Sequence, residues 1–262
     1  MSVILTDADY EVFKRGLKDT IGLDLNHYKQ QQMQRRINQW LDRTGVKTYR
    51  EYLKILQSNG EERGKFTEYL TINTSQFYRD VSVFKEIEEK VLPDLLKRYR
   101  RLKIWSAGAS IGAEVYTIAM ILAELSPGMT HTLLGTDFDV GALAKAKEAV
   151  YGENLLNTLP RMYKDKYFQK EDDLFKLDDN IKRRVRLQRH NLLEDPYDTG
   201  FHMILCRNVF IYFTPETQAA LTAKFSESLV PGGIFVVGSA ENLMAPEAAN
   251  LKRVSYCIYQ RD

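Results

Sequence analysis

The chain has 262 residues, of which 44% are hydrophobic and 27% are charged, and its formal net charge is +2. These values are typical of a globular protein and do not indicate a nucleic-acid partner, because any basic surface must be local. No apolar run reaches the ~20 residues that a membrane-spanning helix needs, and the first residues lack a signal-peptide pattern. Two cysteines and four histidines give neither a disulfide framework nor a metal-ligand cluster. We therefore expect a cytoplasmic protein that does not insert into the membrane and binds no metal.

The first third of the chain is predicted to form a small helical domain. Apolar residues recur at helical spacing in four segments, at about residues 7–21, 25–43, 49–56 and 66–72. Turn-forming residues separate the segments, and nothing in this part resembles a catalytic motif.

The second of these helical segments carries a basic face. Lys29, Arg35 and Arg36 lie largely off its apolar stripe. Such a face is typical of a solvated surface, and it is also typical of a docking surface for an acidic partner helix or for nucleic acid. The residues alone leave these interpretations open.

A polar segment leads into the next predicted helix. Asn73-Thr74-Ser75 can be loop or capping residues before a helix over about 84–92. Arg79 follows two aromatic residues, so it is a candidate for a cation held in a site. Pro93 lies inside the helical pattern and predicts a kink or a new helix start there.

A strand, a turn of small residues and a helix follow one another over residues 103–125. Gly108 and Gly112 occupy the turn, and apolar residues then recur at helical spacing. Glycines in such a turn let a ligand approach the backbone and meet the positive end of the helix. The pattern is typical of a cofactor seat, and a packing turn in any βαβ unit can look the same.

The second predicted strand, at about 131–136, ends in Asp137-Phe138-Asp139. A carboxylate at this place accepts hydrogen bonds from ribose hydroxyls in nucleotide-binding α/β folds. Asp137 lies about 30 residues after the first strand, close to the spacing of such a unit. We expect Asp137 to bind a ligand, whereas Asp139 can be a surface residue or a helix cap.

Alternating strands and helices continue to the end of the chain. A passage at 151–179 interrupts them with a short helix at about 159–168 and a strand at 174–177. Further strands are predicted at about 184–190, 201–206, 234–238 and 254–259, with a helix that begins at Thr214-Pro215. This order predicts a mostly parallel sheet with an antiparallel edge.

Four candidate ligand residues fall at the carboxyl ends of the predicted parallel strands, where ligands bind in such sheets. They are Gly108, Asp137, Asn191 and Asn208. Their agreement favours a cofactor over a packing turn.

Gly108-Ala109-Ser110-Ile111-Gly112 also fits the G-x-S-x-G nucleophile elbow of α/β-hydrolases. That alternative would make Ser110 a nucleophile and requires a histidine in a loop after the last strands. It is disfavoured because His202 lies inside a predicted strand and no glycine-rich oxyanion loop precedes the turn. A nicotinamide enzyme is disfavoured because the turn lacks the G-x-G-x-x-G spacing.

Five motifs occur in a fixed order and carry a specific resemblance. They are Thr71-Ile72-Asn73-Thr74-Ser75-Gln76-Phe77-Tyr78-Arg79, Trp105-Ser106-Ala107-Gly108, Gly135-Thr136-Asp137-Phe138-Asp139, Cys206-Arg207-Asn208-Val209-Phe210-Ile211-Tyr212-Phe213 and Pro231-Gly232-Gly233. With them, the whole chain is similar to the CheR-type chemotaxis receptor glutamate O-methyltransferases, which use S-adenosylmethionine. The fourth motif is the most specific.

The resemblance implies an α/β fold, a Rossmann-like class I methyltransferase sheet with a small inserted β-subdomain, preceded by an all-helical N-terminal domain. It implies a receptor-docking domain at 1–75 and a methyltransferase domain at 76–262, with the inserted subdomain at about 152–183 used for receptor contact. The implied reaction transfers a methyl group from S-adenosylmethionine to glutamate carboxylates of chemoreceptors, giving methyl esters and S-adenosylhomocysteine. The implied partners are the cytoplasmic methylation helices of the receptors, without nucleic acid, and we expect a monomer.

The resemblance also implies which residues form the site. The residues around the cofactor would be Asn73, Ser75, Arg79, Glu114, Asp137, Asn191, Leu192, Arg207 and Asn208, and Gly108 would let its amino-acid end lie close. Arg79 and Tyr212 would lie at the methyl-transfer centre. The basic face, with Lys29, Arg35 and Arg36, becomes a candidate for docking on acidic receptor helices.

This chemistry fits the residues present. A glutamate side chain has a reference pKa near 4.3, so the nucleophile is ionised at neutral pH and needs alignment rather than a general base. Arg79 could hold a carboxylate through paired hydrogen bonds, and the Tyr212 hydroxyl could orient the attacking carboxylate.

The central turn departs from the family pattern S-x-C-S-T-G-E-E-P-Y at Ala109, Ile111, Ala113 and Val115. Ala113 replaces the first acidic residue and removes one possible polar contact to the cofactor. A non-catalytic module that binds S-adenosylmethionine and a receptor therefore stays open as an alternative.

Overall fold

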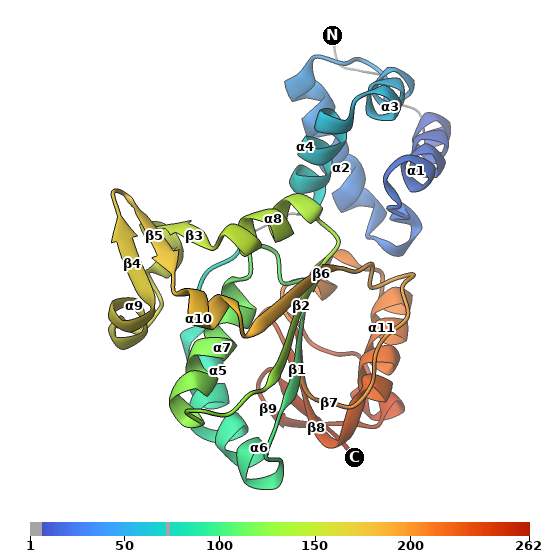
Figure 1. Ribbon diagram of the computed structural model, residues 1–262. Helices are drawn as coiled ribbons and strands as arrows, with labels where there is room; N and C mark the ends of the chain where they lie inside the picture. The colour runs from blue at the N-terminus through green and yellow to red at the C-terminus, as the bar shows by residue number, and fades with distance from the viewer. Residues whose placement is uncertain (1–6, 72–73) are drawn as a thin grey trace. The chain divides into compact units, whose positions relative to one another are not determined.

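A computed structural model describes residues 7–71 and 74–262, which form two compact units (Figure 1). Of the described residues, the first unit takes 7–71 and 212–217, and the second takes 74–211 and 218–262. Within the described part of the chain, no helix has the length and apolar character needed to cross a membrane. Nor do those residues include a group of three or more His, Cys, Asp or Glu side chains placed to hold a metal ion.

The helical unit contains the four helices that the apolar periodicity predicts. They are α1 (Asp7–Ile21), α2 (Gln30–Thr44), α3 (Tyr49–Ser58) and α4 (Gly60–Thr71). The second helix begins later than predicted, because Asp24 accepts a hydrogen bond from the Asn26 amide and starts a separate 3-10 turn, η1 (Leu25–His27). Gly45 ends α2 in a left-handed conformation.

Aromatic side chains fill the centre of the helical unit. The Phe13 ring stacks on Tyr49 with 5.0 Å between centroids, and Phe66 meets Tyr52 edge-on at 5.1 Å. All four side chains are buried, so they account for much of the apolar surface that this small unit removes from water.

The segment 212–217 belongs to the helical unit through backbone contacts. The Tyr212 carbonyl accepts a hydrogen bond from the Lys29 amide at 2.9 Å, and the Thr214 amide donates to the His27 carbonyl at 3.0 Å. The ring of Phe213 lies 4.9 Å from that of Tyr28.

The second unit is built on a seven-stranded sheet of order β6-β2-β1-β7-β8-β10-β9. The first five strands are parallel, and β10 is antiparallel to both of its neighbours. The strands are β1 (Lys103–Ala107), β2 (Thr132–Asp137), β6 (Val185–Arg189), β7 (Phe201–Cys206), β8 (Leu229–Val237), β9 (Leu251–Ser255) and β10 (Ile258–Arg261). The predicted mostly parallel sheet with an antiparallel edge is confirmed.

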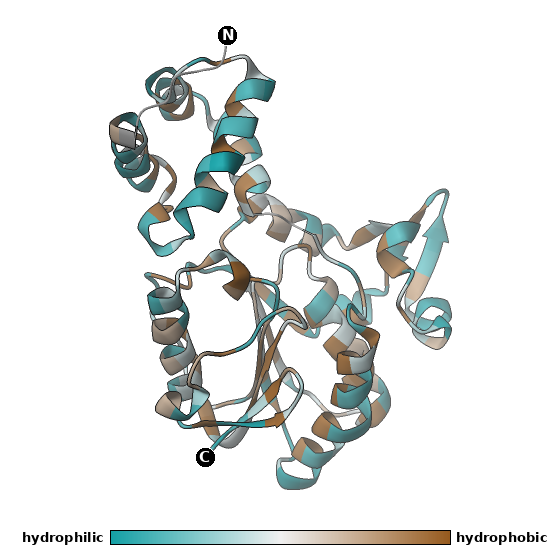
Figure 2. Ribbon diagram, turned by 180° about the vertical axis from the view of Figure 1, so that it is seen from behind, coloured by the Kyte–Doolittle hydropathy of each residue, from teal (hydrophilic) through white to brown (hydrophobic). Residues whose placement is uncertain are grey.

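Two helices of this unit precede β1, and the others follow strands as in other α/β folds. They are α5 (Val81–Glu86), α6 (Leu92–Arg98), α7 (Ala113–Leu125), α8 (Val140–Glu148) and α11 (Pro215–Ser228), with short 3-10 turns η3 (Glu153–Leu156), η4 (Phe210–Tyr212) and η5 (Pro246–Ala249). Hydrophobic and hydrophilic residues alternate along the helices in Figure 2, as expected when one face packs and the other is solvated. Trp105 of β1 is buried against Phe201 and Phe225.

Two local predictions are refined by the structure. Before Pro93 the helix widens into a π-helical turn (Ile87–Val91), in which the Leu92 amide donates to the Ile87 carbonyl. The helix thus passes the proline, which has no amide to donate, and continues as α6. The single strand predicted at 254–259 is wrong: it is the hairpin of β9 and β10, whose turn at Tyr256-Cys257 contains no glycine or proline to reveal it.

A small antiparallel sheet of order β3-β5-β4 lies within the interrupting passage. Its strands are β3 (Val150–Gly152), β4 (Phe168–Glu171) and β5 (Leu174–Leu177), flanked by α9 (Arg161–Tyr167) and α10 (Asp179–Lys182). The predicted short helix and the strand at 174–177 are confirmed, whereas the sequence patterns do not predict β3 and β4. The Phe77 ring meets Tyr151 and Phe168 edge-on and attaches this sheet to the segment before α5.

Candidate functional site

The turn after β1 is fixed to β2 by backbone hydrogen bonds. The amides of Gly108 and Ala109 both donate to the Thr136 carbonyl at 2.8 Å. Gly108 has a φ of 81°, and a Cβ on it would lie 2.7 Å from Cγ2 of Val209. The position therefore needs glycine both for its left-handed backbone and for the close approach of the loop after β7.

Asp137 is the last residue of β2 and organises the same turn. Its Oδ2 accepts a hydrogen bond from the Ser110 amide at 2.7 Å, and its Oδ1 accepts one from the Asp139 amide at 2.9 Å. Only 9% of the residue is exposed, and this burial raises the pKa of its carboxyl to about 6. A carboxylate offers about four acceptor positions, so capacity for a ligand hydroxyl remains. Asp139 caps α8 through Gly141 and Ala142.

The four histidines have contacts away from the turn after β1. Nδ1 of His131 accepts from the Leu102 amide, Nδ1 of His202 accepts from the Lys103 amide, and His27 meets Thr217. The His190 ring packs against Trp105. Burial lowers the pKa of the three later histidines. These contacts are those of structural histidines and do not support Ser110 as a hydrolase nucleophile.

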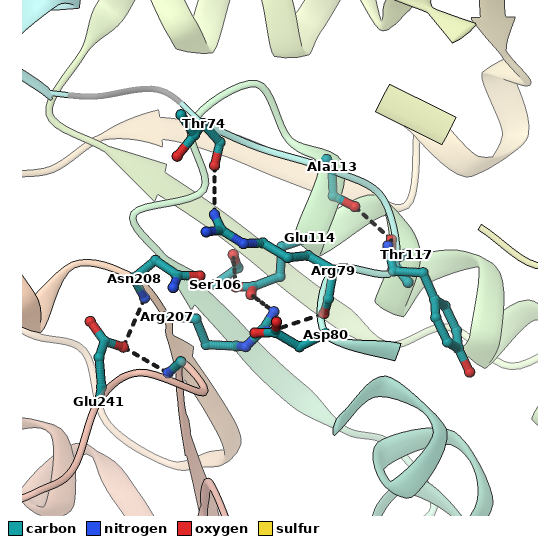
Figure 3. Close-up of polar contacts among 12 residues, drawn as sticks. Thr74, Arg79, Asp80, Ser106, Ala113, Glu114, Thr117, Arg207, Asn208 and Glu241 are labelled. Carbon is teal, nitrogen blue, oxygen red and sulfur yellow. Dashed lines mark hydrogen bonds and ion pairs between the residues drawn. The ribbon is translucent and has the colours of Figure 1, made fainter. Parts of the chain in front are cut away.

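A buried ion cluster lies at the end of β7 (Figure 3). The Arg207 side chain is 2% exposed, and its guanidinium meets Oδ2 of Asp80 at 2.7 Å and Oε2 of Glu114 at 3.1 Å. It also donates to the Arg79 carbonyl at 3.1 Å. Oε1 of Glu114 accepts a hydrogen bond from the Ser106 hydroxyl at 2.8 Å. Arg207 thus ties the segment before α5 to the first turn of α7.

Arg79 has a more open environment. Its side chain is half-buried and donates to the Thr74 carbonyl at 2.7 Å, and it makes no ion pair with a carboxylate in the described ranges (Figure 3). Its charge is therefore available to a bound anionic group. Ser75 lies half-buried in the same segment. Asn73 and Ile72 lie outside the described residues, so the predicted contribution of Asn73 stays a prediction.

The turn after β6 is held by Asn191. This residue is buried, its amide donates to Oδ2 of Asp195 at 2.7 Å, and its Oδ1 accepts from the Leu193 amide at 3.0 Å. The Leu192 carbonyl accepts the Tyr197 hydroxyl at 2.8 Å. The Leu192 side chain is half-buried.

Asn208 and Glu241 form a further connection that the sequence reasoning missed. Asn208 has a left-handed backbone with a φ of 61°, and its amide donates to Oε2 of Glu241 at 2.8 Å (Figure 3). Glu241 is 4% exposed and follows β8 closely. An acidic residue at or just after the end of a strand is the sequence signal that could have identified Glu241, as it identified Asp137.

The positions after four parallel strands come to one edge of the sheet. Gly108, Asp137, Asn191 and Asn208 follow or end β1, β2, β6 and β7, which are neighbours in parallel register. This edge combines a close backbone approach, a carboxylate acceptor and a side-chain amide, which together suit a nucleoside-containing ligand.

The remaining predicted residues belong to the helical unit. Lys29 and Arg35 are exposed, whereas Arg36 is half-buried and donates from Nε to the Tyr69 carbonyl at 2.9 Å. Its guanidinium also lies 4.2 Å from the Tyr69 ring, and burial lowers its pKa. Arg36 therefore has a structural contact that Lys29 and Arg35 do not share. Tyr212 belongs to this unit by its backbone contacts.

Comparison with known proteins agrees with this division of the chain. The family "CheR methyltransferase, SAM binding domain" matches residues 73–257, and "CheR methyltransferase, all-alpha domain" matches residues 8–71. A chemotaxis protein methyltransferase of Listeria monocytogenes is 34% identical over 255 residues, which cover 97% of each chain. One of Borreliella burgdorferi is 30% identical, with 93% of this chain and 90% of the relative covered. Chemotaxis protein methyltransferase 2 of Vibrio cholerae is 29% identical, with 92% and 88% covered.

Proposed function

Because this chain belongs to the CheR methyltransferase family, we propose that it transfers a methyl group from S-adenosylmethionine to glutamate side chains of chemoreceptors. The observation that carries the proposal is the match of both family domains, in order, over residues 8–71 and 73–257. The products would be glutamate methyl esters and S-adenosylhomocysteine. No observation favours the hydrolase alternative.

The edge of the sheet fits the cofactor. At Gly108 the place of a Cβ is taken by Val209, so glycine lets the turn and the loop after β7 meet, and the backbone of this turn would lie beside the amino-acid end of the cofactor. Asp137 would accept hydrogen bonds from the ribose hydroxyls, and the Asn208 side chain would bind the cofactor from the loop after β7. Ser75, Asn191 and Leu192 would complete the seat, with Asn73 as a further candidate.

We assign Arg207 and Glu114 an organising role in this site. Arg207 lies between Asp80 and Glu114, so its charge is compensated within the protein. The cluster fixes the backbone that leads to Arg79, whose carbonyl is one of its acceptors. The Arg79 guanidinium itself makes no ion pair with a carboxylate in the part of the chain that the structure describes, so its charge can pair with a ligand.

Bound S-adenosylmethionine supplies an electrophilic methyl group on a sulfonium. The glutamate nucleophile is already ionised at neutral pH, so the protein needs no general base. Arg79 would hold a carboxylate through paired hydrogen bonds, and Tyr212 would orient the attacking carboxylate by one. In this account the side chains act by alignment, which suits an in-line displacement.

Receptor docking is proposed for two exposed cations, Lys29 at the N-cap of α2 and Arg35 within α2. Lys29 and Arg35 would contact acidic cytoplasmic methylation helices, whereas Arg36 would mainly support the surface through Tyr69. The small sheet β3-β5-β4 would provide a second receptor contact. On this proposal the protein works in the cytoplasm as a monomer, without nucleic acid.

The decisive assay is labelled methyl transfer to receptor-containing membranes, followed by base treatment. Carboxyl methyl esters release methanol in base and N-methyl products do not, so we expect base-labile label with the wild-type chain. Arg79→Ala and Tyr212→Phe should each reduce the rate. Absence of base-labile label with competent receptors would contradict the enzyme and favour the non-catalytic cofactor-binding module, for which Ala113 is the candidate cause.

A further inference from the structure

Glu241 is a buried acidic residue to which the proposed mechanism gives no role. It lies three residues after Gly238, where β8 has just ended, and it is 4% exposed. Its carboxylate makes no ion pair anywhere in 7–71 or 74–262. A buried carboxylate without a cation needs several hydrogen bonds to remain favourable, so its partners indicate its purpose.

Three backbone amides supply those hydrogen bonds. Oε2 of Glu241 accepts from the Asn208 amide at 2.8 Å and from the Gly238 amide at 2.7 Å. Oε1 accepts from the Ile211 amide at 3.2 Å. The carboxylate therefore connects the loop after β7 to the loop after β8, two neighbouring parallel strands.

The glycine at 238 keeps space for this connection. A Cβ there would lie 2.7 Å from Oε2 of Glu241 and 2.9 Å from both the amide nitrogen and Nδ2 of Asn208. These separations are too short for a carbon atom, so any larger residue would displace the carboxylate or Asn208. Glycine is required here by close approach.

The connection fixes the backbone of a residue assigned to the cofactor. Asn208 has a φ of 61°, a left-handed conformation that asparagine tolerates better than most residues, and the hydrogen bond from its amide to Glu241 fixes it there. Its amide is satisfied by Glu241, whereas its side-chain amide has no hydrogen-bond partner within the described chain. The backbone is thus held while the side chain is left for a ligand.

From this arrangement we infer that Glu241 is a positioning residue of the cofactor site, which acts by holding Asn208 and the loop in which Asn208 lies. The inference rests on the proposed function, because it takes Asn208 to be a cofactor contact. Glu241 itself touches no reacting group. A glutamine at 241 could satisfy the amides with only one of its two end groups, since its NH2 group would face an N–H.

The test is a double-mutant cycle read by calorimetry with S-adenosylhomocysteine. The variants are Glu241→Gln, Asn208→Ala and the double variant, with Glu247→Gln as the control, because Glu247 is an exposed glutamate in the same segment. We expect Glu241→Gln to weaken binding by roughly tenfold, in line with the loss of one charge-assisted hydrogen bond. It should weaken binding much less in the Asn208→Ala background, and Glu247→Gln should bind as the wild type does.

A purely structural role would give a different result. Equal losses in both backgrounds, or wild-type affinity for Glu241→Gln, would overturn the inference. In methyl-transfer assays the KM for S-adenosylmethionine should rise by roughly tenfold while kcat changes less than about threefold. If Glu241→Gln does not fold, Glu241→Asp carries the test, because it keeps the charge while its shorter side chain draws the carboxylate back from the three amides. Wild-type protein that binds no S-adenosylhomocysteine would contradict the proposed function itself.

Discussion

Two segments at the carboxyl edge of the sheet are stabilised in different ways. The β1 turn (residues 108–112) is held by backbone hydrogen bonds to β2 and by small residues that fit against their neighbours. The β7 loop (residues 207–211) is held by buried charges, with Arg207 between two carboxylates and Glu241 bound by three amides. The first segment depends on shape and the second on electrostatic compensation.

This difference determines how each segment tolerates substitution. Ala113, directly after the β1 turn, lacks the acidic side chain of the family pattern, yet the turn needs only glycines, small side chains and Asp137 to keep its form. In the β7 loop, removing the buried Arg207 leaves the half-buried carboxylates of Asp80 and Glu114 without their cation. We therefore expect the β7 loop to be the more sensitive of the two.

The largest expected effect is that of Arg207→Met. This change leaves Asp80 and Glu114 close together without their cation. Breaking a fully buried pair costs about 3–5 kcal/mol in the free energy of unfolding, and because these carboxylates are half-buried we expect a loss of about 2–3 kcal/mol. Urea denaturation measures it. Arg186→Met is the control, because Arg186 is exposed, and it should change stability by less than about 0.5 kcal/mol. A loss below about 1 kcal/mol for Arg207→Met, within the range of an exposed pair, would remove the distinction between the two segments.

Gly108→Ala tests the β1 turn and should have the next largest effect. The left-handed backbone alone costs an alanine about 1–2 kcal/mol, and contact with Val209 adds to it. Gly128→Ala is a matched control, since Gly128 has a φ of 78° and a Cβ added to it would meet nothing within 4 Å. Urea denaturation should show Gly108→Ala to be the more destabilising. Equal losses would show that the close packing against Val209 contributes nothing.

Protonation of Asp137 should have a smaller effect, which is measured as a change in the affinity for the cofactor product. Burial raises the pKa of Asp137 to about 6, and the ionised carboxylate is the stronger acceptor, because protonation removes its charge and turns one acceptor position into a donor. The affinity for S-adenosylhomocysteine should therefore fall by about tenfold per unit as the pH decreases below 6, by calorimetry. Asp137→Asn should bind weakly with little pH dependence. An unchanged affinity from about pH 7 to about pH 5 would contradict the ribose contact.

The raised pKa of Asp137 has the opposite effect on the stability of the fold: lower pH weakens cofactor binding but favours the folded state. Because the folded-state pKa of Asp137 lies above its ordinary value of 3.8, protonation favours the folded state. This contribution is fully present below pH 3.8 and is lost as the pH rises through about 6. The ionised Asp137 therefore destabilises the folded state at the pH where it would bind the ribose hydroxyls.

The smallest expected effect concerns exposed charge, in contrast to the buried Arg207. Arg35→Glu should lower receptor methylation by a few-fold at low salt, because exposed charges attract weakly and are screened within ~8 Å at physiological ionic strength. The affinity for S-adenosylhomocysteine should not change. Methylation measured over a range of salt concentrations tests this, and a defect that persists at high salt would argue against electrostatic docking.

The same contrast explains what could be predicted from the sequence. The β1 turn and Asp137 lie in local patterns of glycine, apolar strand and carboxylate, which neighbouring residues reveal. The partners of Arg207 lie 127 and 93 residues away, and Glu241 lies 33 residues from Asn208. Contacts at that separation depend on strand order, which spacing alone does not determine.

The secondary structure could likewise be predicted only where the local sequence carries a clear pattern. Periodicity predicts the helices of the first unit and the parallel strands. It does not predict the polar strand β4 or the β9–β10 turn at Tyr256-Cys257, because their residues lack the usual strand and turn signals.

The most direct test of the proposed cofactor site is a crystal structure of the chain with S-adenosylhomocysteine. We predict ribose hydroxyls on the Asp137 carboxylate, the amino-acid end of the ligand beside Gly108, and the Asn208 side chain in contact with the ligand. Arg207 should keep its pairs with Asp80 and Glu114. A ligand bound away from the carboxyl ends of β1, β2 and β7, or ribose hydroxyls that do not contact Asp137, would contradict the account.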